Sequence, residues 1–130
     1  MPPLLIAATT PDDPGFVALR TESLEQHFNM LRRLAENWQS GKNRFNAPGE
    51  TLLGAFVNHQ LVGVCGINSD PFSPQPRVGR IRHLYISERY RRRGIGQQLL
   101  VSVITHSSAW FDFLNTHAPA QAWPFYERLG

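Results

Sequence analysis

The sequence predicts an α+β domain, in which strands and helices are interspersed along one chain. Runs of β-prone apolar residues lie at 51–57 and 61–67, and apolar residues recur at helical spacing over residues 16–38. A third strand-like run, at 81–86, leads through two glycines into a helix-like segment. The chain has 130 residues, of which 42% are apolar and 18% charged, so we expect residues 1–130 to form a single soluble globular domain.

The first forty residues predict a strand followed by helix. Residues 4–10 are mostly apolar and favour a short strand. Pro11-Asp12-Asp13-Pro14 marks a helix start, because an aspartate caps a helix and proline suits its first turn. Apolar residues then recur at helical spacing at Phe16, Leu19, Leu24, Phe28, Leu31, Ala35 and Trp38. The spacing fits one long helix or two short ones bent near Asn29, with the apolar stripe packed in the core.

The middle of the chain predicts a loop and a β-hairpin. Residues 39–50 are polar and contain two glycines and a proline, which favours a loop. The runs at 51–57 and 61–67 read as strands, and residues 58–60 join them as a hairpin. Cys65 lies in the second strand, where we expect it to be packed in the core, because no partner that would activate the thiol is evident.

The last sixty residues predict two further strands and two helices. Residues 70–77 contain three prolines and must form an exposed loop, after which the strand at 81–86 begins. The following helix is expected to end at Ser107-Ser108. Residues 110–114 alternate weakly and predict a strand that closes at Asn115-Thr116, and residues 119–129 predict a short final helix opened by a proline.

The stretch from Arg80 to Leu100 predicts an anion-binding turn. Between its strand and its helix lies Arg91-Arg92-Arg93-Gly94-Ile95-Gly96. Glycines allow a tight turn, and the backbone N–H groups at a helix N-terminus then point toward one place, which suits a phosphate or pyrophosphate. Three arginines beside that turn add full positive charge with bidentate geometry.

The positive charge is concentrated at this stretch. Residues 80–93 hold six arginines and one acid, a net charge of +5, whereas the whole chain carries +3. The remainder is therefore slightly acidic, which favours a compact anionic ligand over a long nucleic-acid track.

Three segments together resemble the GNAT N-acetyltransferase superfamily. The Arg91-x-x-Gly94-x-Gly96 motif is similar to its Q/R-x-x-G-x-G/A signature, and Leu84-Tyr85-Ile86 is similar to its central "LYV" strand. Residues 122–130 resemble its A-x-x-FYE-x-LG helix. The resemblance covers roughly residues 78–130. It implies a three-layer α/β/α arrangement, with a mixed, largely antiparallel central sheet flanked by helices.

The resemblance also implies acetyl-CoA as co-substrate, with no metal, and direct acetyl transfer to a primary amine in a ternary complex. The expected cofactor contacts are Leu84, Tyr85, Ile86, Arg91, Arg92, Arg93, Gly94, Ile95, Gly96, Gln97 and Asn115. Tyr126 matches the tyrosine that is often the general acid of this family, and a phenol with a pKa of about 10 can protonate a leaving thiolate.

The chain departs from the family pattern in three ways. Arg80 and Arg82 occupy the strand positions where many members carry a glutamate base, so the general base is unassigned. His83 has a suitable pKa range, although a lone strand histidine is more often structural. Pro119 stands where the family has a cofactor-binding asparagine. The sequence stops at Gly130, where members continue, usually with one or two more strands, so we expect those strands to be missing here.

Other functions compete with this interpretation. A Rossmann site is disfavoured because Leu99 occupies the place of the third glycine, and a nucleic-acid module lacks an aromatic platform. The strongest alternative is a catalytically inactive acyl-CoA-binding or regulatory protein, which would need no base. The expected partner is a small-molecule or peptide amine, for which the arginines favour a carboxylate unless the cofactor phosphates use them all.

We expect no nucleic-acid or membrane partner. An unpaired sheet edge makes a homodimer plausible. The apolar run at residues 4–8 is too short for a membrane span and lacks a cationic flank, so we expect no signal peptide. Cys65 is the one cysteine, and a reducing cytoplasm is the expected compartment.

Overall fold

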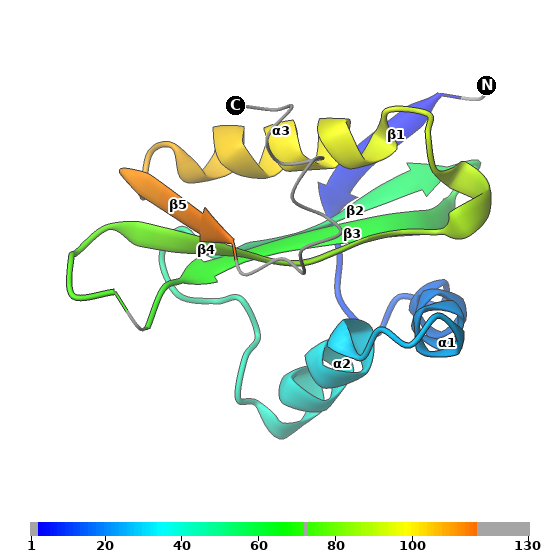
Figure 1. Ribbon diagram of the computed structural model, residues 1–130, viewed down its shortest axis with the longest axis horizontal. Coiled ribbons are helices and arrows are strands. Elements are labelled where there is room, and N and C mark those ends of the chain that lie inside the picture. The colour runs from blue at the N-terminus through cyan, green and yellow to red at the C-terminus, as the bar shows by residue number, and fades with distance from the viewer. Residues whose placement is uncertain (1–2, 72, 117–130) are drawn as a thin grey trace.

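The computed structural model describes residues 3–71 and 73–116. These residues form a five-stranded sheet and three α-helices (Figure 1). The elements are β1 (Leu4–Ala8), α1 (Phe16–Glu25), α2 (Met30–Ser40), β2 (Thr51–Val57), β3 (Gln60–Ser69), β4 (Val78–Ile86), the 3-10 helix η1 (Glu88–Tyr90), α3 (Ile95–Ser107) and β5 (Phe113–Thr116).

The sheet is open, with strand order β1-β2-β3-β4-β5. The first four strands are antiparallel neighbours, and β5 joins β4 in parallel, which confirms the predicted mixed, largely antiparallel sheet. The parallel register runs from Val78 opposite Phe113 to Ile81 opposite Thr116. Beyond Ile81, β4 pairs only with β3 within the part of the chain that the structure describes.

Helices cover both faces of the sheet, as the three-layer prediction requires. Figure 1 shows α3 along one face and α1 with α2 against the other. The core is split accordingly. Leu99, Leu100 and Val103 of α3 pack with Ile81 on one face, whereas Phe16 of α1 and Leu31 of α2 pack with Tyr85 on the opposite face.

Residues 16–38 form two helices, which selects the second of the two predicted alternatives. The chain leaves α1 through His27, whose φ of +65° is left-handed, and the N–H of Phe28 bonds back to the carbonyl of Ser23 at 2.9 Å. A left-handed residue ends a helix because it turns the backbone out of the helical path. Neither helix, nor α3, is long and apolar enough to span a membrane.

The predicted hairpin is confirmed, and the predicted strand at 110–114 is partly wrong. Asn58 and His59 both have positive φ, as a two-residue turn between antiparallel strands requires. The last strand begins only at Phe113, because Trp110 and Phe111 donate their N–H groups to the carbonyl of Ser107 and so continue the turn after α3. The helix predicted at 119–129 lies outside the described residues.

Candidate functional site

β4 contains a bulge at the point where its pairing with β5 has ended. Val64 pairs with Tyr85 and Gly66 with Arg82, so Cys65 alone faces both His83 and Leu84. His83 has a φ of +63°, a conformation that a side chain disfavours. A bulge bends a strand and takes backbone groups out of the regular ladder. Of the predicted cofactor residues, Leu84 is part of this bulge, and Tyr85 and Ile86 lie immediately after it.

The N-terminus of α3 lies at the end of the chain segment that follows β4 (Figure 1). Gly94 precedes the helix with a φ of +78°, and no side chain of the described residues caps it. The first helical bond runs from the N–H of Gln98 to the carbonyl of Gly94 at 3.0 Å. The N–H groups of Ile95, Gly96 and Gln97 therefore precede the helical bonding pattern.

This turn fits a pyrophosphate. A Cβ placed on Gly94 would meet no atom within 4 Å, so the space in front of the turn is open. The helix start carries partial positive charge, and Arg91, Arg92 and Arg93 are all exposed beside it. The bend thus leads from sheet to helix with donors and charge gathered at one point, as the sequence predicts.

The three arginines differ in their contacts. Arg91 donates to the carbonyl of Ile86 at 2.9 Å and to the side chain of Gln26 at 2.8 Å, and lies 5.2 Å from the Tyr85 ring centre. Arg93 lies 5.4 Å from the ring centre of Tyr90. Arg91 therefore holds the turn against β4 and α1, whereas Arg92 and Arg93 extend from the turn itself. Cofactor contact by each of the three stays a prediction.

A network of hydrogen bonds joins α1 to this turn, and we call it the α1 network. Its members are Glu22, Gln26, Tyr85, Ser87, Glu88 and Arg91. The Glu22 carboxylate accepts from the Tyr85 hydroxyl, from the Ser87 hydroxyl at 3.1 Å and from the backbone N–H of Glu88 at 3.1 Å. Gln26, one helical turn later, accepts from Arg91 and donates to the Glu88 carboxylate at 3.0 Å.

The α1 network shifts two pKa values in opposite directions. Burial favours a raised pKa for Glu22, but hydrogen bonds from Tyr85, Glu88 and Ser87 outweigh it, so the pKa lies below its ordinary value of 4.5. Burial first, and then the bond to Glu22, raise the pKa of Tyr85 well above its ordinary range. At neutral pH an ionised carboxylate therefore accepts from a neutral phenol.

The sequence analysis did not identify Glu22 and Gln26. Their spacing of four residues on α1 is an ordinary pattern for a solvated helix face, and their partners lie about 60 residues further along the chain. Only the packing of α1 beside the end of β4 brings them together. Nothing in the sequence signals that contact.

Of the two remaining predicted site residues, Asn115 lies within the described structure and Tyr126 does not. Asn115 lies in β5 opposite Arg80, and its side chain donates to the Asp70 carboxylate at 3.0 Å. Its partner Arg80 lies three residues before His83, the first residue of the bulge, and the predicted cofactor contact of Asn115 stays a prediction. Tyr126, the predicted general acid, lies outside the described residues.

The residues considered as base or nucleophile are unsuited to those roles. Burial, and then the charges of Arg82 and Arg80, lower the pKa of His83 to about 3; the Met30 carbonyl lies near enough to oppose the shift but does not meet hydrogen-bond geometry with the ring. His83 is therefore a weak proton acceptor at neutral pH. Burial raises the pKa of Cys65 to about 12 and its side chain is fully enclosed, so it is a packed core residue, as expected.

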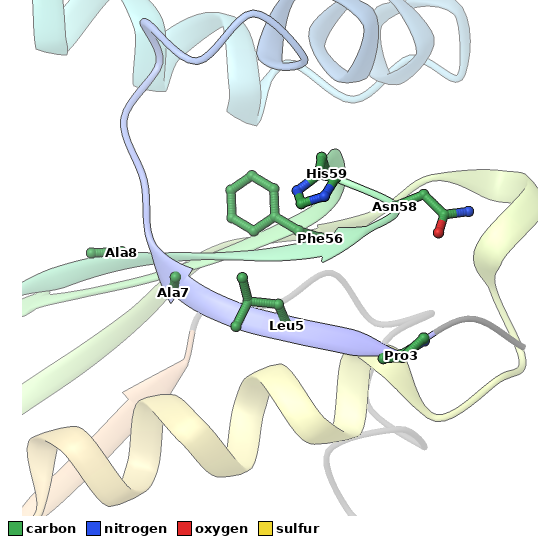
Figure 2. Close-up of a pocket in the computed structure, with 7 residues that line it drawn as sticks. All are labelled: Pro3, Leu5, Ala7, Ala8, Phe56, Asn58 and His59. Atoms are coloured by element: carbon green, nitrogen blue, oxygen red, sulfur yellow. The ribbon is translucent and has the colours of Figure 1, made fainter.

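Figure 2 shows a separate hollow of about 490 Å³ along β1 and the β2–β3 turn. It is lined mainly by apolar residues, with Asn58 and His59 at one end. β1 is the sheet edge opposite β5, and none of the predicted cofactor residues lines this hollow.

Comparisons with known proteins agree with this geometry. A family model described as Acetyltransferase (GNAT) family matches residues 15–130. A solved structure of a proposed acetyltransferase from Exiguobacterium sp. 255-15 has a TM-score of 0.87 at 28% identity, over 98% of this chain and 84% of that one. The comparison with curated proteins found no match.

More distant structures share the fold. A ribosomal-protein-alanine N-acetyltransferase from Brucella melitensis biovar Abortus 2308 has a TM-score of 0.70 at 21% identity, over 98% of this chain and 91% of that one. A glucosamine-6-phosphate N-acetyltransferase from Arabidopsis thaliana has a TM-score of 0.69 at 15% identity, over 98% and 90%. The family match covers most of the sequence, including the bulge and the turn, and the chain therefore belongs to the GNAT family of acetyltransferases.

Proposed function

We propose that this protein is an N-acetyltransferase that moves the acetyl group of acetyl-CoA directly to a primary amine. One observation carries the proposal: a bulged strand segment, which has no partner on its β5 side among the described residues, leads to a helix start that no described side chain caps and that three exposed arginines precede. Such an arrangement offers backbone donors for a diphosphate at one end and for a thioester at the other.

The proposed cofactor contacts follow the chain from strand to helix. The N–H groups at Ile95, Gly96 and Gln97, with Gly94 before them, bind the diphosphate, and the side chains of Arg92 and Arg93 add charge. The backbone of residues 84–86 lies along the pantetheine and acetyl groups. The support is the open space at Gly94 and the position of residues 84–86, of which Tyr85 and Ile86 pair with β3 and all lie beyond the described pairing with β5.

Acetyl-CoA supplies the acetyl group as a thioester. The protein aligns the acceptor amine with the thioester carbonyl, so that the new C–N bond forms as the C–S bond breaks. A backbone N–H beside the bulge donates to the carbonyl oxygen as it gains negative charge. We propose that Tyr126 gives its proton to the leaving thiolate. The acceptor attacks as the free amine and releases one proton to solvent, since no described residue is assigned as its base: His83 is too weak a base, with its pKa lowered to about 3, and Arg80 and Arg82 are cations.

The second candidate is an acyl-CoA-binding protein without catalysis. The observation that favours it is the pair of arginines at positions where many relatives carry an acid that serves as base. It predicts the same cofactor site but no turnover.

Two measurements on the purified chain separate the candidates. Calorimetry with acetyl-CoA tests the site, and release of the coenzyme A thiol in the presence of an amine panel tests the reaction. Cys65 is fully enclosed, so a thiol reagent detects the released coenzyme. Binding with amine-dependent release supports the enzyme; binding without release supports the inactive protein; no binding contradicts both. The homodimer and the cytoplasmic compartment stay predictions.

A further inference from the structure

A second group of basic residues lies on the sheet face that α1 and α2 cover. Ile81 packs on the α3 side, so its strand neighbours Arg80 and Arg82 point to the opposite face. The bulge turns His83 to that same face, where its ring meets Phe45 edge-on at 6.3 Å. Arg82, His83 and, two residues earlier, Arg80 therefore form one basic strip, which we call the β4 strip.

The acidic groups around the β4 strip are already engaged. Arg82 is partly buried and makes no hydrogen bond or ion pair with residues 3–71 or 73–116. Burial and the like charge of Arg80 both lower its pKa, and the more distant Glu50 only partly offsets them. The Glu50 carboxylate accepts backbone N–H groups of Ala47 at 3.2 Å and Ser69 at 2.9 Å. Asp70 lies at the Arg80 end, where Asn115 donates to it.

His83 supplies an independent indication of a ligand. Its side chain is 8% exposed, and neither ring nitrogen has a hydrogen-bond partner among the described residues. A buried polar atom without a partner is destabilising, so such an atom in a native protein calls for an explanation. A polar group of a bound molecule, placed between His83 and Arg82, provides one.

We propose that the β4 strip binds a carboxylate of the acceptor, and that the acceptor is a small amine of the amino acid class. The inference rests on the proposed function, because it places the reacting amine at the bulge. Arg82 directly precedes the bulge, and successive strand residues are about 3.3 Å apart. The carboxylate and the amine must therefore be close together in the acceptor. Arg82 supplies a bidentate partner for the carboxylate, and the ring N–H of His83 supplies a further donor.

The test compares each amino acid with its carboxamide, such as glycine with glycinamide, over a panel of side chains. Concentrations of free amine are equalised, because a carboxamide lowers the pKa of the neighbouring amine. We expect the wild-type chain to prefer the acids. Arg82→Gln should raise KM for the acids by about tenfold or more, since it removes a charge-assisted hydrogen bond to the carboxylate. KM for carboxamides and Kd for coenzyme A should not change.

Two further variants serve as controls for the effect of Arg82→Gln. Arg33→Gln removes an exposed charge from α2 and should change neither KM nor Kd. Arg82→Lys keeps the charge and should retain part of the preference for acids, and thermal unfolding verifies that each variant is folded. The proposal is wrong if acids and carboxamides react equally in the wild type, or if Arg82→Gln weakens both alike.

A binding measurement tests the inference independently of the proposed function. If no amine is acetylated, the proposed function is wrong, but the β4 strip can still be tested as a carboxylate site. N-acetylated amino acids and their carboxamides are titrated into the chain saturated with coenzyme A. Binding that requires the carboxylate and is lost in Arg82→Gln supports the β4 strip as its site. Equal binding of the two sets, or binding of neither, rejects it.

Discussion

The molecule carries two groups of arginines less than fifteen residues apart, and they sit in opposite environments. Arg92 and Arg93 stand exposed on a turn before a helix, whereas Arg80 and Arg82 lie partly buried on a sheet face. An exposed charge stays hydrated and acts over a distance that salt shortens. A partly buried charge has lost some of its water and gains most from one well-placed partner.

The difference teaches that residue type alone does not define a binding role. The turn arginines accompany backbone donors and suit a ligand of high charge. The arginines of the β4 strip accompany a buried histidine and an asparagine pair, Asn43 and Asn68, whose amides exchange hydrogen bonds of 3.0 Å. Variants should therefore separate the two groups, with cofactor affinity following the turn and acceptor preference following the strip.

The largest expected effect is on the turn. Gly94→Asp places a carboxylate at a φ of +78° in front of the helix start, and should weaken coenzyme A binding by at least about 100-fold, or 2.7 kcal/mol. Gly41→Asp is the matched control, because Gly41 has a φ of +79° and equally open surroundings at the end of α2. Calorimetry giving the same Kd for both variants would show that the cofactor binds elsewhere.

The next largest effect is on the chemical step, in which Tyr126 is the proposed general acid. Tyr126→Phe should lower kcat by about 10- to 100-fold, the range of a lost general acid, while Kd for coenzyme A and KM for the acceptor stay constant. Tyr90→Phe serves as control, because it keeps the ring between Arg89 and Arg93. Steady-state kinetics with unaltered kcat would remove Tyr126 as the acid.

A smaller effect sharpens the role of the turn arginines. The double change Arg92→Gln and Arg93→Gln should weaken coenzyme A binding by about tenfold at low salt and less at high salt, because exposed charges are screened. KM for the acceptor should not change. Arg32→Gln with Arg33→Gln removes the same charge from α2 and should leave Kd unchanged. Salt-independent loss in the turn variant would argue against a charge contact.

The smallest effect concerns the α1 network, which holds the turn in place. Glu22→Gln should destabilise the fold by about 1–2 kcal/mol through weakened hydrogen bonds. It should also raise Kd for coenzyme A by about threefold, since the turn is less preorganised. Glu25→Gln, at an exposed position of the same helix, should do neither. Urea unfolding measures the stability and calorimetry measures Kd for coenzyme A. Equal values for Glu22→Gln and Glu25→Gln would show that the α1 network does not hold the turn in place.

The same variant has a pH signature. The pKa of Glu22 is lower in the folded state than its ordinary value of 4.5, so its stabilisation is complete above that pH and is lost as pH falls through the folded pKa. The difference in unfolding free energy between wild type and Glu22→Gln should therefore shrink in acid. A difference that stays constant from pH 7 to about pH 3 would contradict the lowered pKa.

Most of the fold could be predicted because its signals are local. The apolar run at 51–57, the Asn58-His59 turn and the glycine-led start of α3 each depend on neighbouring residues. Two details could not be predicted in this way. The choice between one long helix and two, which the spacing left open, depends on His27 adopting a left-handed conformation, and the late start of β5 depends on two N–H groups that share the Ser107 carbonyl.

The candidate site likewise has parts that local sequence signals predict and parts that depend on distant contacts. The turn at 91–97 was found from its glycines and arginines, because a helix start next to charged residues is encoded in one short segment. The β4 bulge was not found from residue pattern alone, because it exists only in the register between β3 and β4. Glu22 was missed because its partners Tyr85, Ser87 and Glu88 lie about 60 residues away.

By itself, then, the sequence determined the order of strands and helices and the place of the anion-binding turn, since periodicity and turn chemistry act between near neighbours. Only the tertiary structure decided which arginines are exposed and which lie on the covered face of the sheet. That outcome depends on the bulge at His83, which turns this side chain to the face of Arg82, and on the packing of α1 and α2 over the same face. Burial and register join distant segments, so no local pattern could specify them.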